Sequence, residues 1–373
     1  MKRVLAIAPY RFLPARSGGH RYIQGWYQAL SQQTQLTVIG TADNTLDANS
    51  PYRVLPLLSN SFFRYGDLTL RATIRDLIQR NQYDLLVWEH PYFAWLANLI
   101  KKDTGIPYLL RSHNIEFQRF RSLHKIWWPL LQQYEKWAFQ QADFISFISK
   151  ADKDFATTNW NIDANRCLDI PFGVENDRIP ENRADAAQLI RERYAIPENE
   201  KILLFNGPLD YSPNREALEI IIKYIAPYLQ DQLGAFKILI CGGHAPKKWS
   251  HRKILQNNPF IDAGFVENIK TYIMGADLLL NPILTGGGVK TKIIESISLG
   301  TPVLTTATGA KGIDSHATGN YMQVLNDGHW ENWPSTIVAI LHDTPLKKDP
   351  LTKFFETYNW SKIIEKTVAT LPN

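Results

Sequence analysis

Short apolar runs alternate with longer segments of helical periodicity along the whole chain, and this alternation restricts the fold more than any single motif. The strand-like runs are residues 4–8, 36–40, 52–57, 83–88, 108–112, 143–149, 201–207, 236–243, 260–264, 277–283 and 302–306. The helix-like segments lie near 20–31, 67–80, 92–102, 124–141, 150–157, 214–229, 267–274 and 289–299. Buried strands joined through helices are typical of parallel sheets covered on both faces. The pattern therefore predicts an α/β protein with two doubly wound, Rossmann-like domains that face each other across a cleft.

The length of 373 residues suits two domains of ordinary size. We expect the first domain over residues 1–176 and the second over residues 201–345. Residues 177–200 are charged and contain two prolines, so they are the candidate linker and hinge. The remaining residues, 346–373, are expected to form C-terminal helices.

Two cysteines, Cys167 and Cys241, lie far apart in apolar runs and are predicted to be small buried residues in a reducing compartment. The N-terminal apolar stretch is too short for a secretory signal peptide. No run of about 18 apolar residues is present to span a membrane. We expect a cytoplasmic protein, with the inner face of the membrane as an alternative location. The net charge of +5 permits anionic substrates or a negative membrane surface without demanding either, and no nucleic-acid partner is expected.

Residues 285–304, TGGGVKTKIIESISLGTPVL, carry the most functional information. Three glycines open a helix that has no acidic residue before Glu295, whereas Lys290 and Lys292 lie in its first turn. Cations there are unfavourable by roughly 0.3–1 kcal/mol each, so stability alone does not explain them. Free backbone N–H groups beside two lysines are typical of an anion site, and the natural ligand is a phosphate or diphosphate. The alternative is a flexible turn with two solvated lysines.

This segment resembles the nucleotide-sugar site of the family 4 glycosyltransferases, which are retaining enzymes with the GT-B fold. Glu295, Ser296 and the sequence GTPV at residues 300–303 match the second half of the family motif Glu-(x)7-Glu. The first Glu of that motif would fall at Gly287 and is missing. A subset of the family carries GGGTRLKILEA here, and GGGVKTKIIES is close to it.

The resemblance implies a donor site built from several loops of the second domain. The broader family neutralises the diphosphate with an Arg and a Lys in the loop that holds Pro208 and Asn214 here, so Lys290 and Lys292 are expected to replace them. Phe265 and Val266 would line the nucleobase, and Glu295 would bind the ribose hydroxyls; its alternative role is an ion pair with Lys292. The full set expected at the donor is Gly18, Gly19, Gly207, Asn214, Gly243, Phe265, Val266, Gly287, Gly288, Lys290, Thr291, Lys292 and Glu295. No metal site and no cofactor are expected.

Two loops of the first domain complete the expected site. Gly18 and Gly19 follow the first strand, where the family has a Gly-Gly loop near the sugar and phosphate; a simple turn is the alternative. His113, Asn114 and Glu116 end the fifth strand, where the subset often shows His-Asn-x-Glu, and they are the candidate catalytic residues. A neutral imidazole can accept a proton from a sugar hydroxyl or hold that hydroxyl in place. The alternative for His113 is a loop histidine bonded to the backbone.

Residues 117–137 mix aromatic and basic side chains, which leaves two interpretations open. The segment could pack on the sheet as an ordinary helix, or it could contact a membrane interface. Pro129 interrupts any single long amphipathic helix. At the C-terminus, the GT-B resemblance implies that the last helix crosses back to the first domain, with Trp360 as its anchor.

The combined prediction is a retaining glycosyltransferase for polysaccharide or glycoconjugate synthesis. The donor would be a nucleotide diphosphate sugar bound to the second domain. The acceptor would be a saccharide, a lipid-linked sugar or another hydroxyl compound on the side of the first domain. Two alternatives stay open. One is a nucleotide-sugar epimerase of the same fold, and the other is a non-catalytic nucleotide-sugar-binding subunit, suggested by the missing Glu at Gly287.

Overall fold

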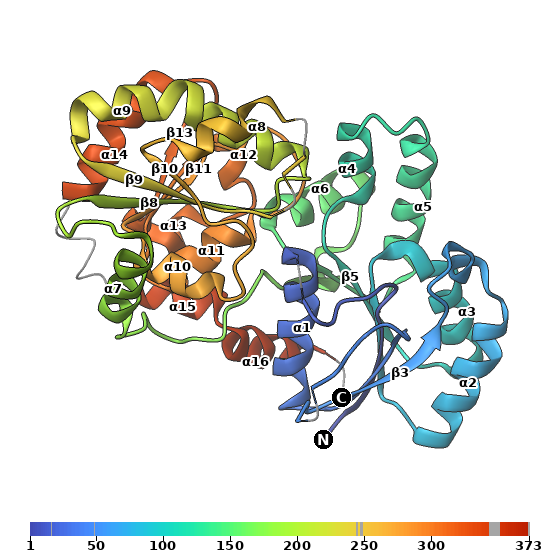
Figure 1. Ribbon diagram of the computed structural model, residues 1–373. Helices are drawn as coiled ribbons and strands as arrows, with labels where there is room; N and C mark the ends of the chain where they lie inside the picture. The colour runs from blue at the N-terminus through green and yellow to red at the C-terminus, as the bar shows by residue number, and fades with distance from the viewer. Residues whose placement is uncertain (16, 48, 244, 247–248, 343–350, 372–373) are drawn as a thin grey trace. The chain divides into compact units, whose positions relative to one another are not determined.

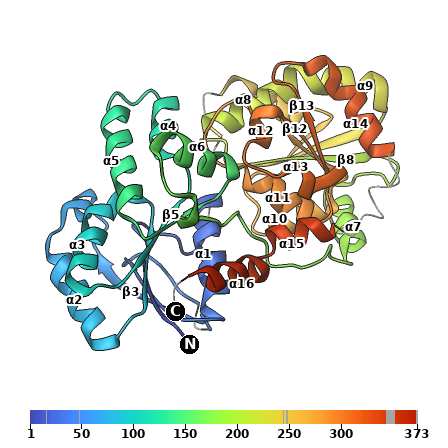
Figure 2. The ribbon, with the colours of Figure 1, turned by 180° about the vertical axis from the view of Figure 1, so that it is seen from behind.

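The computed structural model describes residues 1–15, 17–47, 49–243, 245–246, 249–342 and 351–371. The chain divides into two compact units. Unit 1 comprises Met1–Glu175 together with Tyr358–Asn373, and unit 2 comprises Asn176–Thr357. Each unit is a parallel sheet with helices on both faces (Figure 1, Figure 2), which confirms the predicted doubly wound α/β class.

The sheet of unit 1 has seven strands in the order β3-β2-β1-β4-β5-β6-β7, and every neighbouring pair is parallel. The strands are β1 (Arg3–Ile7), β2 (Gln35–Thr41), β3 (Arg53–Leu58), β4 (Leu85–Glu89), β5 (Tyr108–Ser112), β6 (Phe144–Phe147) and β7 (Cys167–Asp169). The first six match the predicted runs. The sequence pattern missed β7, because three residues are too few to show a periodicity.

Helices cover the two faces of this sheet unequally. The helices are α1 (Gly18–Ser31), α2 (Thr69–Asn81), α3 (Ala94–Thr104), α4 (Glu116–Ser122), α5 (Trp128–Gln141), α6 (Lys150–Trp160) and α16 (Trp360–Thr370), with short turns η1 (Phe62–Gly66), η2 (Pro91–Phe93) and η3 (Ala164–Arg166). Apolar residues of α2, α3, α5 and α6 form one core with alternate strand residues such as Leu5, Ile7, Leu86 and Trp88. Helix α1 covers the other face, and its apolar residues Ile23, Trp26 and Leu30 are buried. Because successive side chains of a strand point to opposite faces of the sheet, each strand contributes residues to the apolar packing on both faces.

The last helix of the chain, α16, packs on α1 through Trp360. An added Cβ at Gly25 would lie 2.2 Å from Trp360 Nε1, and one at Gly173 would lie 2.3 Å from Trp360 Cδ2. No side chain fits at either position, so both glycines are required by this close approach. The backbone just before α16 is held in place as well. Val174 N–H donates to Tyr358 O, and Trp360 N–H donates to Val174 O at 2.9 Å.

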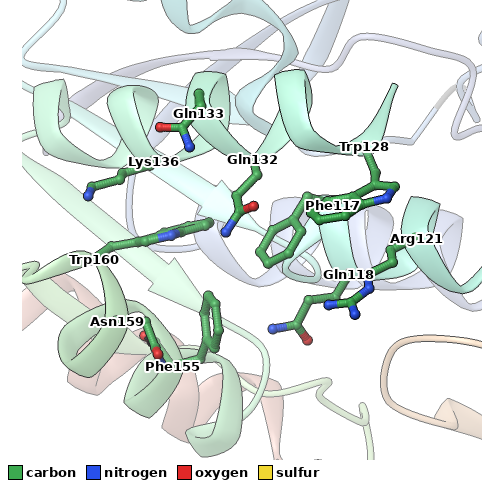
Figure 3. Close-up of a pocket in the computed structure, with 10 residues that line it drawn as sticks. All are labelled: Phe117, Gln118, Arg121, Trp128, Gln132, Gln133, Lys136, Phe155, Asn159 and Trp160. Atoms are coloured by element: carbon green, nitrogen blue, oxygen red, sulfur yellow. Dashed lines mark hydrogen bonds between the residues drawn. The ribbon is translucent and has the colours of Figure 1, made fainter. Parts of the chain in front are cut away.

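The segment 117–137 contributes to two helices, of which the second matches the helix predicted near 124–141 and the first was not predicted. Helix α4 ends at Ser122, and α5 begins at Trp128 with Pro129 in its first turn, where proline costs no hydrogen bond. The base of this α4–α5 hairpin packs on the core through Phe117 and Trp128. Its tip is exposed, with Ile126 93% and Leu130 76% accessible. A groove borders α4, α5 and α6 (Figure 3).

The sheet of unit 2 has six parallel strands in the order β10-β9-β8-β11-β12-β13. They are β8 (Lys201–Asn206), β9 (Phe236–Cys241), β10 (Phe260–Asp262), β11 (Leu278–Asn281), β12 (Val303–Thr306) and β13 (Met322–Leu325). The first five match predicted runs, whereas β13 was not predicted because polar Gln323 divides its apolar residues.

The helices of unit 2 lie on both faces of its sheet (Figure 1). They are α7 (Arg183–Tyr194), α8 (Ser212–Ile220), the π-turn η4 (Ile221–Ile225), α9 (Ala226–Leu233), η5 (Ser250–Gln256), α10 (Ile269–Gly275), α11 (Thr291–Ser298), α12 (Ala307–Ala310), α13 (Ser315–Thr318), η6 (Gly319–Tyr321), η7 (Trp330–Asn332), α14 (Trp333–His342) and α15 (Thr352–Tyr358). Ile293, Ile294 and Ile297 of α11 are fully buried, and their spacing places them on one face of the helix.

Residues 177–200, which the sequence suggested as a linker, contain α7. This helix packs on α10 so closely that an added Cβ at Gly275 would lie 2.9 Å from Ala186 O. Ala186 and Ile190 are buried, and the charged residues that suggested a linker occupy the rest of the helix surface. Arg183 also donates from Nη1 to Thr301 Oγ1 at 2.8 Å within unit 2. A charged helix with only two buried side chains is hard to distinguish from a linker by periodicity.

Both cysteines, Cys167 and Cys241, are free and buried, as their apolar surroundings predicted. Of the helices that the structure describes, none is both long and apolar enough to cross a membrane.

Candidate functional site

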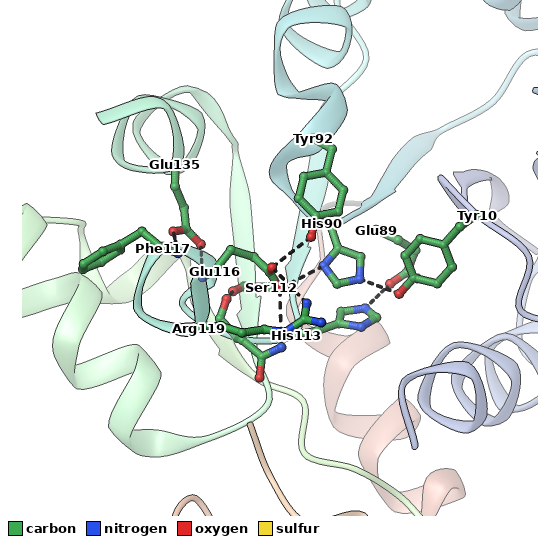
Figure 4. Close-up of polar contacts among 11 residues, drawn as sticks. Tyr10, Glu89, His90, Tyr92, Ser112, His113, Glu116, Phe117, Arg119 and Glu135 are labelled. Atoms are coloured by element: carbon green, nitrogen blue, oxygen red, sulfur yellow. Dashed lines mark hydrogen bonds and ion pairs between the residues drawn. The ribbon is translucent and has the colours of Figure 1, made fainter. Parts of the chain in front are cut away.

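A buried charged cluster lies at the carboxyl ends of β4 and β5 in unit 1. Glu89 ends β4 and stands beside Arg111 of β5 in the strand register. One carboxylate oxygen, Oε1, is 2.5 Å from Arg111 Nη1. The other, Oε2, is 2.5 Å from His113 Nε2 (Figure 4). Arg111 also lies over the rings of Trp26 and Tyr22, at 4.0 and 4.4 Å from their centroids. Adjacent parallel strands thus bring three polar side chains together where ligands bind in such sheets.

The protonation states in this cluster follow from burial and from the charge of Arg111. Burial alone would raise the pKa of Glu89, but Arg111 and the hydrogen bond from His113 outweigh burial and lower the pKa to about 2. Burial and the neighbouring His90 lower the pKa of His113 to about 3, although Glu89 opposes them. His113 is therefore neutral near pH 7, and Arg111 supplies the charge that keeps Glu89 ionised. An ionised carboxylate only accepts, so His113 donates its Nε2–H to Glu89 and its Nδ1 is left as an acceptor.

A second group of polar side chains surrounds His90, which follows β4. The rings of His90 and His113 are 4.0 Å apart, and Tyr10 Oη lies 2.7 Å from His90 Nε2. Tyr92 donates its hydroxyl to Glu116 Oε2 at 2.8 Å, and His90 Nδ1 is 3.6 Å from Glu116 Oε1, beyond hydrogen-bond length (Figure 4). Burial would raise the pKa of Glu116, but His90 and Arg119 outweigh it and lower the pKa to about 2. Glu116 is therefore an ionised acceptor within the cluster.

The first turn of α4 is fixed by a carboxylate from α5. Glu135 accepts from the backbone N–H of Glu116 at 2.8 Å and of Phe117 at 3.1 Å. Burial raises the pKa of Glu135 to about 8 against the opposing effect of these two donors. Asn114 Nδ2 lies 3.4 Å from Glu116 Oε1. The structure thus holds Asn114 and Glu116 in one network and connects that network to His113 through the ring of His90.

Sequence reasoning named His113, Asn114 and Glu116 but missed the groups that orient them. Glu89 and His90 gave only a weak signal, a polar pair at the end of a strand, and Arg111 was read as part of the strand. The pairing of Arg111 with Glu89 depends on which strands are neighbours, and a pattern along the chain does not contain that information. His113 bonds a carboxylate side chain, which differs from the alternative of a loop histidine bonded to the backbone.

Gly18 and Gly19 form the first turn of α1, directly after the loop that follows β1. Ser17 caps the helix by accepting from His20 N–H at 3.3 Å, and no acidic residue lies in the first turn. An added Cβ at Gly19 would meet nothing within 4 Å. Packing inside unit 1 therefore does not require a glycine at position 19, which is consistent with a turn that leaves space for a ligand.

In unit 2, the Gly-rich loop between β11 and α11 is tied back by Lys290. Its ammonium donates to Gly286 O and Gly288 O, each at 2.9 Å, and to Gly287 O at 3.3 Å. Gly286 and Gly288 have φ of 87° and 74°, a region that favours glycine. Helix α11 begins at Thr291 with no side-chain cap and no acidic residue in its first turn, as predicted. Three successive glycine carbonyl oxygens, those of Gly286, Gly287 and Gly288, thus bind the ammonium of Lys290.

Lys292 connects this helix start to the loop that follows β8. Its ammonium donates to Asn206 O at 2.7 Å and lies 3.4 Å from Asn214 Oδ1. Asn214 in turn donates to Pro208 O at 2.9 Å. Gly207 has φ 143°, and an added Cβ there would lie 2.6 Å from Asn214 Nδ2. The two loops that were predicted to hold the diphosphate therefore meet through the side chain of Lys292.

The charges of Lys290 and Lys292 are not balanced by a carboxylate in the described structure. Across the described part of the chain, no carboxylate oxygen lies within ion-pair distance of Lys290 Nζ or Lys292 Nζ. Burial, and then the charge of Lys311, lowers the pKa of Lys290 to about 8. Burial, and then the charge of Lys290, lowers the pKa of Lys292 to about 7. Lysines that lose part of their charge for lack of a partner would regain it beside an anion.

The remaining predicted donor residues follow β9, β10 and α11. Gly243 lies beside Phe265, because an added Cβ there would be 3.2 Å from Phe265 Cβ. Phe265 is 76% exposed and Val266 is partly buried. Glu295 is partly buried on α11 and forms no ion pair with Lys292, whose ammonium donates to Asn206 instead. Since β8, β9, β10 and β11 are parallel, the loops after them share one edge of the sheet.

The described residues contain no group of three or more His, Cys, Asp or Glu side chains arranged to hold a metal ion.

Comparisons with known proteins match both units. Residues 16–178 match the sequence family Glycosyltransferase Family 4, and residues 200–343 match Glycosyl transferases group 1. No protein of curated function matches the sequence. Among solved structures, a sucrose-phosphate synthase from Thermosynechococcus elongatus aligns over 99% of this chain and 98% of its own, with 16% identity and a TM-score of 0.73.

Two further structures are similar over their whole length. Anabaena HepE in complex with UDP and glucose aligns over 99% of both chains, with 15% identity and a TM-score of 0.71. WaaG, a glycosyltransferase involved in lipopolysaccharide biosynthesis, aligns over 98% of both chains, with 15% identity and a TM-score of 0.65. At these identities the structural matches concern the fold, and they agree with the two sequence families.

Proposed function

Because the chain belongs to the GT-B glycosyltransferases, with a family 4 domain followed by a group 1 domain, we propose that it transfers a sugar from a nucleotide diphosphate sugar to an acceptor hydroxyl with retention of configuration. The observation that carries the donor assignment is the pair Lys290 and Lys292, two partly buried ammonium groups at a Gly-rich helix start that have no carboxylate within ion-pair distance among the described residues. Structures of the similar HepE hold UDP and UDP-glucose, which supports a nucleotide sugar as the donor.

In this proposal the lysines stabilise the leaving group. When the bond between the anomeric carbon and the diphosphate breaks, negative charge develops on the diphosphate oxygen. Lys290 and Lys292 now donate to carbonyl and amide oxygens, and a charged phosphate oxygen is a stronger acceptor than either. The backbone N–H groups at the start of α11 add the positive end of the helix dipole. Preorganised donors of this kind supply a large share of many enzymes' rate enhancement.

The acceptor hydroxyl would lose its proton to the departing diphosphate while its oxygen bonds the anomeric carbon on the face that the diphosphate leaves. This gives retention without a protein nucleophile. His113 is a poor general base near neutral pH because its pKa is about 3. Its role in the proposal is to hold a hydroxyl of the transferred sugar through Nδ1, while Glu89 fixes the ring through Nε2. Glu116 is ionised and would accept from a further hydroxyl.

A thermal-shift screen of nucleoside diphosphates tests the donor first. A nucleotide at 100 times its dissociation constant should stabilise the protein by about 2.7 kcal/mol. Turnover of the matching nucleotide sugar with an acceptor then tests the reaction, and NMR of the product anomer tests retention. Conversion of the sugar without any acceptor would indicate an epimerase. Tight donor binding without turnover on any acceptor would favour the binding-subunit alternative, which the missing Glu at Gly287 motivates.

We also propose that the tip of the α4–α5 hairpin contacts an anionic membrane surface. Ile126 and Leu130 are 93% and 76% exposed, and Trp127 lies beside them. Between residues 117 and 134 the chain contains three Arg or Lys residues and no Asp or Glu. Exposed apolar side chains combined with basic ones suit the interface of an anionic bilayer. The base of the same hairpin packs on the core, so the proposal concerns the exposed tip alone.

Vesicle co-sedimentation tests this contact. The protein should bind vesicles that contain phosphatidylglycerol more strongly than vesicles of phosphatidylcholine alone, and Ile126→Ser with Leu130→Ser should abolish the binding. Leu189→Ser, at an exposed leucine of α7 in unit 2, is the matched control and should leave binding unchanged. Equal binding by the hairpin variant and the wild type would contradict the proposal.

A further inference from the structure

A groove of about 460 Å³ lies between α4, α5 and α6 in unit 1, outside the charged cluster at β4 and β5 (Figure 3). Its volume falls in the range of roughly 300–1,000 Å³ that is usual for small-molecule sites. Helix α4 contributes Phe117, Gln118 and Arg121, α5 contributes Trp128, Gln132, Gln133 and Lys136, and α6 contributes Phe155, Asn159 and Trp160. Three consecutive helices of the chain therefore line one hollow with aromatic, amide and basic side chains.

The aromatic side chains form a fixed wall of this groove. Phe117 and Trp160 are buried members of the hydrophobic core, and Trp128 and Phe155 are partly buried against it. The ring centroid of Phe117 is 5.8 Å from that of Phe155 and 6.1 Å from that of Trp128. The core holds these rings in place whether or not a ligand is bound. An aromatic face is negative, so it attracts the weakly positive C–H groups on one face of a sugar ring.

The amide side chains around the rings are free to bind a ligand. In the described structure, Gln118, Gln132 and Gln133 make no side-chain hydrogen bond to another residue. Asn159 donates to Phe155 O at 3.1 Å, which leaves its carbonyl oxygen as an acceptor. Each free amide offers two N–H donors and one oxygen acceptor. Neighbouring hydroxyl groups, which donate and accept alternately, match this set of groups well.

The charges in the groove are all positive. Lys136 and Arg121 lie at opposite ends of it, with the rings and Gln132 between them (Figure 3). Arg121 lies over the ring of Trp128, 5.1 Å from its centroid. Lys136 has no carboxylate within ion-pair distance among the residues that the structure describes, and no acidic residue lines the groove. A ligand that carries a negative group would therefore meet an uncompensated cation at either end.

We propose that this groove binds an acidic saccharide, one that carries a carboxylate or a phosphate, as the acceptor of the transfer. The inference rests on the proposed function, since it names the substrate class for the acceptor side of that reaction. Helix α4 begins at Glu116 in the charged cluster, and its next two residues, Phe117 and Gln118, line the groove. The rings would bind a sugar face, the amides its hydroxyls, and Lys136 or Arg121 its anionic group.

The test uses matched disaccharides and calorimetric titration of the full chain. The probes are cellobiouronic acid, which carries one carboxylate, and cellobiose, its neutral counterpart. The wild type should bind the acidic disaccharide about tenfold more tightly than the neutral one. Lys136→Gln and Arg121→Gln should together remove that preference. Lys125→Gln with His124→Gln, at exposed basic positions of the hairpin outside the groove, is the control and should preserve the preference.

The outcomes separate this inference from the proposed function. If neither disaccharide binds, or if the groove variant keeps the full preference, the groove does not hold an acidic saccharide, and the inference is overturned. UDP binding, measured on the same samples, should be unchanged in every variant, because none of the altered residues lies in unit 2. Absence of UDP binding and of sugar transfer in the wild type would instead contradict the proposed function.

Discussion

Two groups of charged side chains, one in each unit, are balanced in opposite ways. In unit 1, Arg111 is paired with Glu89, and the carboxylate keeps the charge of the cluster compensated. In unit 2, the described partners of Lys290 and Lys292 are carbonyl and amide oxygens, and the pKa values of the two lysines fall to about 8 and about 7. Both groups lie where parallel strands end, so position alone does not distinguish them. The difference suggests that the first is ready to orient a neutral sugar, whereas the second lacks an anion that a substrate would bring.

The largest effect is expected from removing the unbalanced charge. Lys290→Ala with Lys292→Ala should weaken UDP binding by about a hundredfold or more, since hydrogen bonds to charged groups contribute about 1.5–3 kcal/mol each. Binding of uridine, which lacks phosphate, should change little. Titration calorimetry with both ligands measures the effect. An equal loss for UDP and uridine would mean that the lysines support the loop and do not bind the diphosphate.

Breaking the ion pair of Glu89 and Arg111 should lower the free energy of unfolding and leave the affinity for UDP unchanged. Glu89→Gln leaves Arg111 buried without its carboxylate, and removing one partner of a buried pair destabilises by about 3–5 kcal/mol. Urea unfolding followed by tryptophan fluorescence measures this loss. Glu216→Gln, at an exposed glutamate of α8 in unit 2, is the matched control and should change the stability little.

The ion pair of Glu89 and Arg111 also predicts how the stability of the protein depends on pH. The pKa of Glu89 is lowered in the folded protein from its ordinary value of 4.5 to about 2. Its contribution to stability is therefore fully present above pH 4.5 and is lost as the pH falls toward 2. The stability difference between wild type and Glu89→Gln should shrink over this window. A constant difference would contradict an ionised Glu89.

A smaller effect is expected from removing His113, the residue of the unit 1 cluster that we propose binds the transferred sugar. His113→Ala should lower kcat by about tenfold to a hundredfold, because it removes a positioned hydrogen bond to the transferred sugar. The affinity for UDP should change little. Steady-state kinetics and UDP titration on the same variant separate the two quantities. Normal turnover would leave His113 with a structural role only, and a large loss of UDP affinity would mean that the sugar and the nucleotide have been assigned to the wrong units.

The smallest change is expected at Glu295. Glu295→Gln keeps one acceptor oxygen and removes the charge, so the donor KM should rise by about tenfold. The wild type should discriminate against a 2′-deoxyribose donor, and the variant should discriminate less. Kinetics with the two donors compare these preferences. If wild type and variant discriminate equally, Glu295 does not bind the ribose.

The sequence alone predicted most of the fold, because buried strands and amphipathic helices leave a clear periodicity. It missed β7 and β13, which are too short or too interrupted to show one. It also assigned α7 to a linker, because only Ala186 and Ile190 of that helix are buried and the charged residues dominate its pattern. Periodicity reports burial, so a helix with few buried residues is the element it detects least well.

For the candidate site, the sequence identified the loops but not their internal contacts. The glycines and lysines of 286–292 were recognisable because they conflict with helix stability. The contact of Lys292 with Asn206 depends on which strands are neighbours, and so does the pairing of Glu89 with Arg111. The groove at α4, α5 and α6 depends on the break between α4 and α5 and was not predicted at all. Such features need the topology of the sheet, which spacing along one chain does not encode.

Proton uptake on UDP binding tests most directly whether Lys290 and Lys292 bind the diphosphate anion and regain their full charge beside it. At pH 8 the diphosphate is already fully ionised, and lysines with pKa values of about 8 and about 7 are partly deprotonated. An anion that raises both pKa values must draw protons from solution, so calorimetry in buffers of different ionisation enthalpy should show net proton uptake with UDP and none with uridine. Affinity for UDP should fall as the pH rises above 7. Binding without proton uptake, or with proton release, would contradict the account.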